Sequence, residues 1–195
     1  MRTFEFIESA IPGCFEIKSF FADDARGRFV KEYNQAEFAK HGIQDDLKEV
    51  FYSNNKKGVL RGLHFQRGRM QSKLVSCISG HIWDVVVDLR RDSPMFKHWQ
   101  AFNLTGDGCN QVYVPVGCAH GFLTLEDAIV LYKCGEVFYP EGDSGIRWDD
   151  PDIGVEWPLD KVGGAGKVVL SEKDRKLPSL REFLDTADIS GMEVD

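Results

Sequence analysis

Three basic side chains lie close together in a segment that otherwise has the composition of a buried strand. The segment spans residues 58–66 and contains Arg61 and His64, and Lys73 follows soon after. Basic groups among apolar neighbours are costly to bury without an anionic partner or a ligand. Arg61 and His64 have opposite parity along a strand, but Gly62 between them permits a bulge that re-aims one side chain. The segment therefore predicts either a polar site or a strand end with a solvated arginine and a satisfied histidine.

Acid–base chemistry is the activity that such a site would support. Imidazole titrates near neutral pH, so His64 is the natural general base. A base needs an orienting partner, and Asp174 offers a carboxylate, although sequence alone does not place the two together. Each further candidate also has a structural interpretation: Tyr132 as a core tyrosine bonded to backbone, His120 as a buried histidine at a turn, and Lys73 as a strand-end lysine.

The cysteines and histidines give little support for other chemistries. The five cysteines are odd in number and contain no CxxC pair, which argues against a disulfide framework or a zinc knuckle. Cys118 lies two residues before His120, yet small buried cysteines are far commoner than nucleophiles. A metal site needs two or three imidazoles, and no His-x-His pair follows from His64. We therefore expect neither a metal nor another cofactor.

Length, composition and charge limit the classes of function. The 195 residues, 43% of them hydrophobic, fit one globular domain with a substantial core. The net charge of −7 argues against nucleic-acid binding, although a locally basic pocket could still hold a small anion. No apolar run is long enough to span a bilayer, and acidic residues interrupt the N-terminal segment where a signal peptide needs an apolar core. We expect a cytoplasmic protein that binds neither nucleic acid nor membrane.

Strand signals dominate the elements that must position these residues. Between Val50 and Trp157, short apolar segments alternate with turns every eight to twelve residues, which is typical of an all-β sandwich or barrel, here a jelly roll. Ser79-Gly80 is expected to be the tight turn of a hairpin, and Glu126-Asp127 a second turn. The expected strands are residues 73–79, 81–89, 99–104, 111–115, 121–125 and 128–134.

Helical signals are confined to the two ends of the chain. Residues 34–41 are expected to form a short helix capped by Asn34 and stopped by Gly42. A C-terminal helix is expected after Pro178, with the proline in its first turn, and residues 189–195 are expected to fray. The whole chain, 1–195, reads as one domain, with a core of about 11–176 and a helical tail of about 178–195.

Taken together, these segments resemble the dTDP-4-dehydrorhamnose 3,5-epimerase family, sugar-nucleotide epimerases with a metal-free cupin fold. One matching block is Gly-Val-Leu-Arg-Gly-Leu-His-Phe-Gln, and eight blocks occur in family order and at roughly family spacing. Such an ordered set is far more specific than any block alone. The blocks are residues 58–66, 73–75, 83–90, 93–96, 114–122, 131–133, 145–151 and 170–174.

The resemblance implies catalytic roles for four residues. His64 matches the base that removes a proton, and Asp174 matches the carboxylate that orients it. Tyr132 matches the residue that returns a proton from the opposite face of the sugar ring. Lys73 matches the cation near the C4 oxygen, where enolate charge develops and where a fixed cation would stabilise it.

The resemblance also implies substrate contacts and a homodimer. In the family, N-terminal segments are exchanged between subunits, and Arg26 matches a contact that usually reaches the neighbour's site. Arginine suits a diphosphate because its guanidinium can bond two oxygens at once. Phe138 falls where the family usually has a tyrosine that stacks on the nucleotide base. The other implied contacts are Arg61, His120, Asp143 and Lys173.

Departures from the family pattern concern substrate recognition. Lys31 stands where a glutamate is usual, and residues 52–57 form a segment shorter than the one that carries a Gln-Asp-Asn contact. The leading hypothesis is an epimerase that converts dTDP-4-dehydro-6-deoxyglucose to dTDP-4-dehydrorhamnose by inverting C3 and C5. One alternative is an enzyme that inverts a single centre or uses a CDP- or GDP-linked sugar. Another is a non-catalytic cupin that binds a sugar nucleotide.

Overall fold

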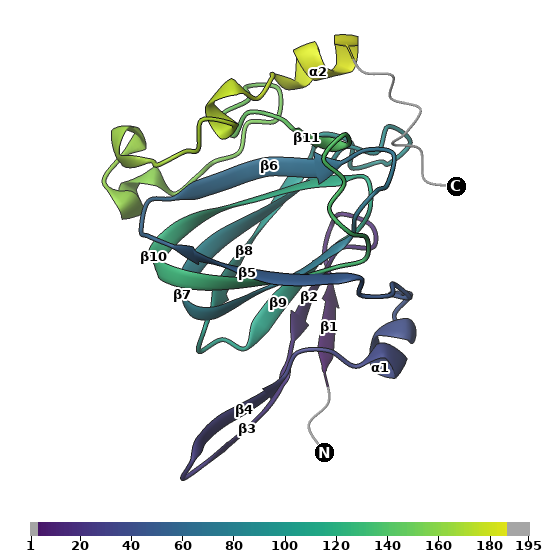
Figure 1. Ribbon diagram of the computed structural model, residues 1–195, viewed down its shortest axis with the longest axis vertical. Coiled ribbons are helices and arrows are strands. Elements are labelled where there is room, and N and C mark those ends of the chain that lie inside the picture. Colours follow the sequence, from purple (N-terminus) through teal and green to yellow (C-terminus); the bar gives the residue numbers. More distant parts are fainter. Residues whose placement is uncertain (1–3, 187–195) are drawn as a thin grey trace.

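The computed structural model describes residues 4–186 and has the jelly-roll architecture that the sequence predicts (Figure 1). In this part of the chain nine strands form one hydrogen-bonded sheet that curls around a core, and β3 and β4 form a separate hairpin. Residues 187–195, where fraying was expected, lie outside the described residues. The strands are β1 (Glu5–Glu8), β2 (Phe15–Lys18), β3 (Phe20–Asp24), β4 (Gly27–Lys31), β5 (Glu49–Asn55), β6 (Leu60–Gln66), β7 (Lys73–Asp88), β8 (Trp99–Thr105), β9 (Asn110–Val114), β10 (Cys118–Cys134) and β11 (Asp143–Gly145).

Two long central strands replace two of the expected turns. The hairpin at Ser79-Gly80 is wrong, because β7 runs through it as one strand of 16 residues. The turn at Glu126-Asp127 is also wrong, since β10 continues for 17 residues with register shifts at that point. Gly80 has φ +80°, and a Cβ there would lie 2.1 Å from the backbone oxygen of Asp127. The residues expected to form turns therefore lie opposite each other at a bulge in β7 and β10, and neither strand reverses direction there.

This irregularity divides the sheet into two walls, because each long strand changes partners there. The first half of β7 pairs with β9 and the second half with β8. The first half of β10 pairs with β6 and the second half with β5. One wall therefore has the order β1-β2-β9-β7-β10-β5 and the other β8-β7-β10-β6-β11, and the two walls enclose a common core (Figure 1).

Alternating side chains of the two long strands fill two separate apolar clusters. Ile82 and Val86 point into the cluster between the walls, whereas Val85 and Val87 point to the opposite side of the same strand. The second cluster is covered by the C-terminal segments, from which Trp157 and Phe183 pack against it. Strands buried on both faces need apolar residues at both parities, as the sequence of residues 81–89 shows.

The helices and the N-terminal strands complete the fold. Helix α1 (Gln35–Ala39) is capped by Asn34, whose side chain accepts a hydrogen bond from the Glu37 N–H, as the sequence predicts. Helix α2 (Leu180–Thr186) begins two residues after Pro178, and Ser179 caps it by accepting from the Glu182 N–H. Strands β1 to β4 were not predicted. Three 3₁₀ turns are η1 (Leu159–Val162), η2 (Ala165–Lys167) and η3 (Asp174–Lys176).

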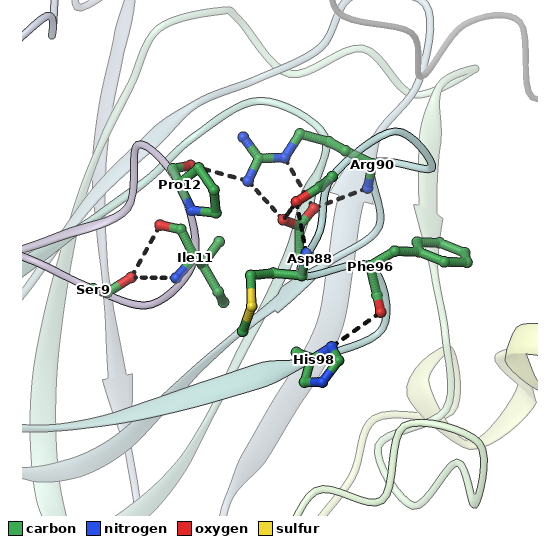
Figure 2. A network of polar contacts seen from close by, with 9 residues as sticks. Ser9, Ile11, Pro12, Asp88, Arg90, Phe96 and His98 are labelled. Carbon is green, nitrogen blue, oxygen red and sulfur yellow. Dashed lines mark hydrogen bonds and ion pairs between the residues drawn. The ribbon is translucent and has the colours of Figure 1, made fainter.

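A polar network fixes the connection from β7 to β8 against the N-terminal segment (Figure 2). The Asp88 carboxylate is fully buried and accepts hydrogen bonds from the Arg90 guanidinium and the Ser93 hydroxyl. Arg90 also donates to the backbone oxygen of Pro12 at 2.9 Å. These contacts lower the pKa of Asp88 against the opposing effect of burial, so the charge is held by its partners.

Candidate active site

A cleft with a volume of about 350 Å³ opens between the second half of β10 and strand β6. Strands β5, β6, β7 and β10 supply most of its walls, and β11 and the segment around Lys173 close one side. Eight of the ten site residues expected from the sequence line it, namely Arg61, His64, Lys73, His120, Tyr132, Phe138, Asp143 and Lys173. A jelly roll thus brings together residues more than one hundred positions apart.

Gly62 explains how Arg61 and His64 reach the same cleft despite their opposite parity. Its φ is +126°, and the pairing of β6 with β10 shifts register beside it. A Cβ at this position would lie 2.6 Å from the Cα of Gly121, so only glycine fits. The bulge predicted from the sequence is confirmed.

His64 and Asp174 form a hydrogen-bonded pair at the edge of the cleft. The imidazole Nε2 lies 2.6 Å from the Asp174 Oδ1, which is buried behind it at the start of η3. Burial raises the pKa of Asp174, but its hydrogen bond with His64 and further contacts outweigh this, so the net pKa is lowered. An ionised carboxylate holds the proton on Nε2 and leaves Nδ1 with a free lone pair.

A second histidine–aspartate pair lies deeper in the same cleft. His120 Nε2 is 2.7 Å from the Asp84 Oδ2, and both side chains are buried. Burial raises the pKa of Asp84 despite the opposing charges of His120 and Lys73, and its Oδ1 has no hydrogen-bond partner among the described residues. Sequence reasoning missed Asp84, although an acidic residue at an inward-facing position of an apolar strand was the signal.

Lys73 and Tyr132 complete the set of titratable groups. The Lys73 side chain makes no hydrogen bond or ion pair with the described residues, and burial lowers its pKa. Burial also raises the pKa of Tyr132, helped by the Asp84 charge and opposed by Arg61 and Ser53. The phenol is therefore protonated at neutral pH and above.

Besides His120, three of the expected substrate contacts already bond to neighbouring side chains, namely Arg61, Asp143 and Lys173. The Arg61 Nε donates to the Asn55 Oδ1 at 2.8 Å. Lys173 donates to Asp143 in an ion pair across the side of the cleft. Six further lining residues were not expected from the sequence. Phe65, Gln66 and Phe122 lie within matching blocks but were given no role, and Phe51, Ser53 and Gln71 lie outside them.

Arg26 does not join the others in the cleft. It lies in the turn of the β3–β4 hairpin, which projects away from the body of the sheet (Figure 1). Its side chain is 90% exposed and contacts Asp24 within the same turn. This position leaves untested the expectation that Arg26 reaches the cleft of a neighbouring subunit, which stays a prediction.

The remaining candidates are structural. Cys118 does not line the cleft, and burial strongly raises the pKa of its thiol, which disfavours the reactive thiolate. Residues 4–186 contain no group of three or more His, Cys, Asp or Glu side chains placed to hold a metal ion. They also contain no helix long and apolar enough to cross a membrane.

A jelly roll whose cleft holds a histidine–aspartate pair, a tyrosine and a lysine defines a cupin-type acid–base enzyme. The family model for dTDP-4-dehydrorhamnose 3,5-epimerase matches residues 8–182. A curated relative of that name from Methanothermobacter thermautotrophicus is 44% identical over 93% of this chain and 97% of its own. The chain belongs to the dTDP-4-dehydrorhamnose 3,5-epimerase family, an isomerase family, as its sequence predicts.

Solved structures agree with this membership. A dTDP-6-deoxy-D-glucose-3,5-epimerase from Legionella pneumophila, in complex with dTDP-4-keto-L-rhamnose, has a TM-score of 0.88 and 32% identity over 98% of each chain. A 3′-monoepimerase from Streptomyces bikiniensis, in complex with dTDP-quinovose, has a TM-score of 0.82 and 28% identity over 91% of this chain and 88% of its own. Chains of this fold are thus named for double and for single inversion.

Proposed function

We propose that this enzyme converts dTDP-4-dehydro-6-deoxyglucose to dTDP-4-dehydrorhamnose by inverting C3 and C5 in turn. The observation that carries the proposal is the meeting of His64, Tyr132 and Lys73 in one cleft, with Asp174 behind the histidine. A carbon next to a ketone loses its proton only if the developing oxyanion is stabilised. Inversion further needs a base and an acid acting on opposite faces.

His64 acts as the base at each centre. Its Nδ1 takes the proton from C3 or C5, and the electron pair of the broken C–H bond moves into the enolate. The negative charge then collects on the C4 oxygen. The Lys73 ammonium is the candidate partner, because it makes no hydrogen bond or ion pair with the described residues. A buried ammonium gains more from such a contact than an exposed one.

Tyr132 acts as the acid. Its O–H proton passes to the carbon from the opposite face, and the ketone re-forms as the enolate electrons return. The resulting phenolate recovers a proton from solvent, and His64 loses its own to solvent, so the enzyme returns to its starting state. The Tyr132 phenol carries its proton at neutral pH, as an acid requires.

The nucleotide and the sugar have their own candidate contacts. Arg61 and Lys173 offer positive charge to the diphosphate, and His120 and Asp143 offer hydrogen bonds to the sugar. Phe138 is exposed at the rim of the cleft, where an aromatic ring can stack on the thymine.

The active unit is proposed to be a homodimer. Among residues 4–186, the exposed Arg26 at the tip of a projecting hairpin bonds only with Asp24 of its own turn, which suits a side chain that completes a neighbour's cleft. Mixing Arg26→Ala subunits with His64→Ala subunits tests this. Hybrids should regain activity, because one of their two clefts then has both residues, and continued inactivity of verified hybrids would contradict exchange between subunits. A cytoplasmic location remains a prediction.

Solvent deuterium exchange with a panel of dTDP-, CDP- and GDP-linked 4-keto-6-deoxy sugars tests the proposed reaction. The proposal predicts a dTDP-sugar product with both centres inverted and a deuteron at each. One deuteron with one inverted centre would instead identify a single-centre epimerase, as the name of the Streptomyces bikiniensis neighbour indicates for that enzyme. No exchange with any sugar would indicate a non-catalytic binder.

A further inference from the structure

Strand β5 carries three residues that each contact the active-site groups from the same side. Phe51, Ser53 and Asn55 are two positions apart and therefore share one face of the strand. Asn55 accepts from the Arg61 Nε and donates to the Ser53 hydroxyl at 3.0 Å. Ser53 in turn lies close enough to Tyr132 to lower the pKa of the phenol, against the larger effect of burial. The face of β5 is thus in contact with two residues of the proposed machinery.

Phe51 makes the most specific of these contacts. It is the cross-strand partner of Tyr132, and the two rings stack with centroids 4.8 Å apart and planes 16° from parallel. Phe51 is 45% exposed, whereas Tyr132 is only 8% exposed. His120 contacts the same tyrosine edge-on, with centroids 6.1 Å apart. Tyr132 is therefore held on one face by Phe51 and at an edge by His120.

An exposed phenylalanine on an edge strand would ordinarily be unfavourable, because it leaves a large apolar ring in water. Here that ring separates a buried tyrosine from solvent. Residues 52–57, where this sequence departs from the Gln-Asp-Asn pattern of the family, begin directly after Phe51.

We propose that Phe51 is a positioning residue for the proton-returning tyrosine. It fixes the ring plane of Tyr132 and excludes water from that face, so that the enolate receives its proton from the phenol and not from water. The proposal rests on the acid role of Tyr132 set out above. Phe51 therefore affects how efficiently the carbon is inverted. It does not affect the removal of the proton by His64.

The measurement is the number of inversions per deuterium exchange event, followed in heavy water with the dTDP-linked 4-keto sugar. In Phe51→Ala the tyrosine loses its stacked neighbour and water gains access. The enolate is then reprotonated from water or by His64 more often, and we expect the ratio to fall by about 3- to 30-fold, as for other small losses of orientation. Phe51→Tyr keeps a flat ring and should restore the ratio to within about twofold of wild type.

Tyr52→Ala is the matched control, because Tyr52 is an exposed aromatic on the opposite face of the same strand. It should keep the wild-type ratio even if it changes the overall rate. If Phe51→Ala does not fold, Phe51→Leu is measured in its place, with a drop in the ratio again expected.

Failure of this inference is distinguishable from failure of the proposed function. A wild-type enzyme that shows no exchange, or exchange without inversion, would contradict the proposed function itself. A wild-type enzyme that inverts normally, together with an unchanged ratio in Phe51→Ala, would overturn the role of Phe51 alone. Loss of all exchange in a folded Phe51→Ala enzyme would overturn it too, since Phe51 would then act on proton removal.

Discussion

Two histidine–aspartate pairs lie side by side in this cleft and differ in their contact with solvent. His64 and His120 are cross-strand partners on β6 and β10, and their distances to Asp174 and Asp84 are 2.6 and 2.7 Å. The His64 side chain is 29% exposed, whereas that of His120 is 4% exposed. The same two residue types in nearly the same geometry therefore meet different surroundings.

The two carboxylates show what this difference does. Hydrogen bonds and charge lower the pKa of Asp174 despite burial, whereas burial dominates at Asp84 and raises its pKa. An ionised Asp174 favours a proton on the facing nitrogen and a free lone pair on the other, as a base requires. The deeper pair also lines the cleft but is less exposed to solvent, which suits a contact that fixes the sugar. Burial, more than residue type, separates the two roles.

Replacing each histidine by asparagine has the largest expected effect on activity. It also tests whether the two histidine–aspartate pairs have different roles. Asparagine keeps a hydrogen-bond donor for the aspartate but cannot remove a proton. His64→Asn should lower deuterium exchange by about 10³-fold or more, and His120→Asn by about 10- to 100-fold. Exchange rates in heavy water, with nucleotide binding measured alongside, check this. A larger loss in His120→Asn than in His64→Asn would reverse the assignment.

Tyr132→Phe sharpens the comparison by separating proton removal from proton return. The variant keeps both histidine–aspartate pairs and loses only the hydroxyl of Tyr132. Exchange should stay within about tenfold of wild type, whereas inversion should fall by about 10²-fold or more, since only His64 or water can then reprotonate the carbon. Mass and NMR analysis of one sample gives both values. Inversion at the wild-type ratio to exchange would remove Tyr132 from the mechanism.

The smallest expected effect concerns stability and tests the two carboxylates directly. The folded-state pKa of Asp174 is lowered, so its charge stabilises the fold above the unfolded pKa of about 3.9 and this contribution is lost as pH falls through the folded value. The folded-state pKa of Asp84 is raised, so its contribution is present at low pH and lost as pH rises through the folded value.

Substitution by asparagine should therefore act in opposite directions at neutral pH. Asp174→Asn should lower the free energy of unfolding by about 1–3 kcal/mol, through the loss of a charge-assisted hydrogen bond. Asp84→Asn should raise it, because a charge that is unfavourable in its buried site is removed. Denaturant unfolding from neutral toward acid pH checks both, and both differences should shrink as the carboxyls become protonated. Changes of the same sign at neutral pH would refute the contrast.

The sequence predicted the site better than it predicted the strand boundaries. Seven of the expected residues belong to the ordered blocks that resemble the family, and the backbone conformation of Gly62 explains how Arg61 and His64 share a cleft. The turns at residues 79–80 and 126–127 were wrong because turn-forming residues also occur at bulges within long strands. Local sequence does not distinguish a turn from a bulge. The contact between Asp127 and Gly80 on neighbouring strands does, and it is known only from the structure.

Residues that act through another residue escaped prediction for a related reason. Asp84 and Phe51 lie on different strands from the groups they contact, His120 and Tyr132. Their importance depends on strand register, which the sequence did not determine here. Arg26 was identified only through the family resemblance, because nothing within one subunit places it near the cleft.

Chemical rescue by imidazole tests the central claim most directly, namely that the exposed pair supplies the base. Both histidines line the cleft, but the His64 side chain is 29% exposed and that of His120 only 4%, so the space left by His64→Ala is more accessible to a small base. Added imidazole should restore deuterium exchange to His64→Ala in proportion to its concentration and should leave His120→Ala unchanged. Rescue of His120→Ala without rescue of His64→Ala would contradict the account.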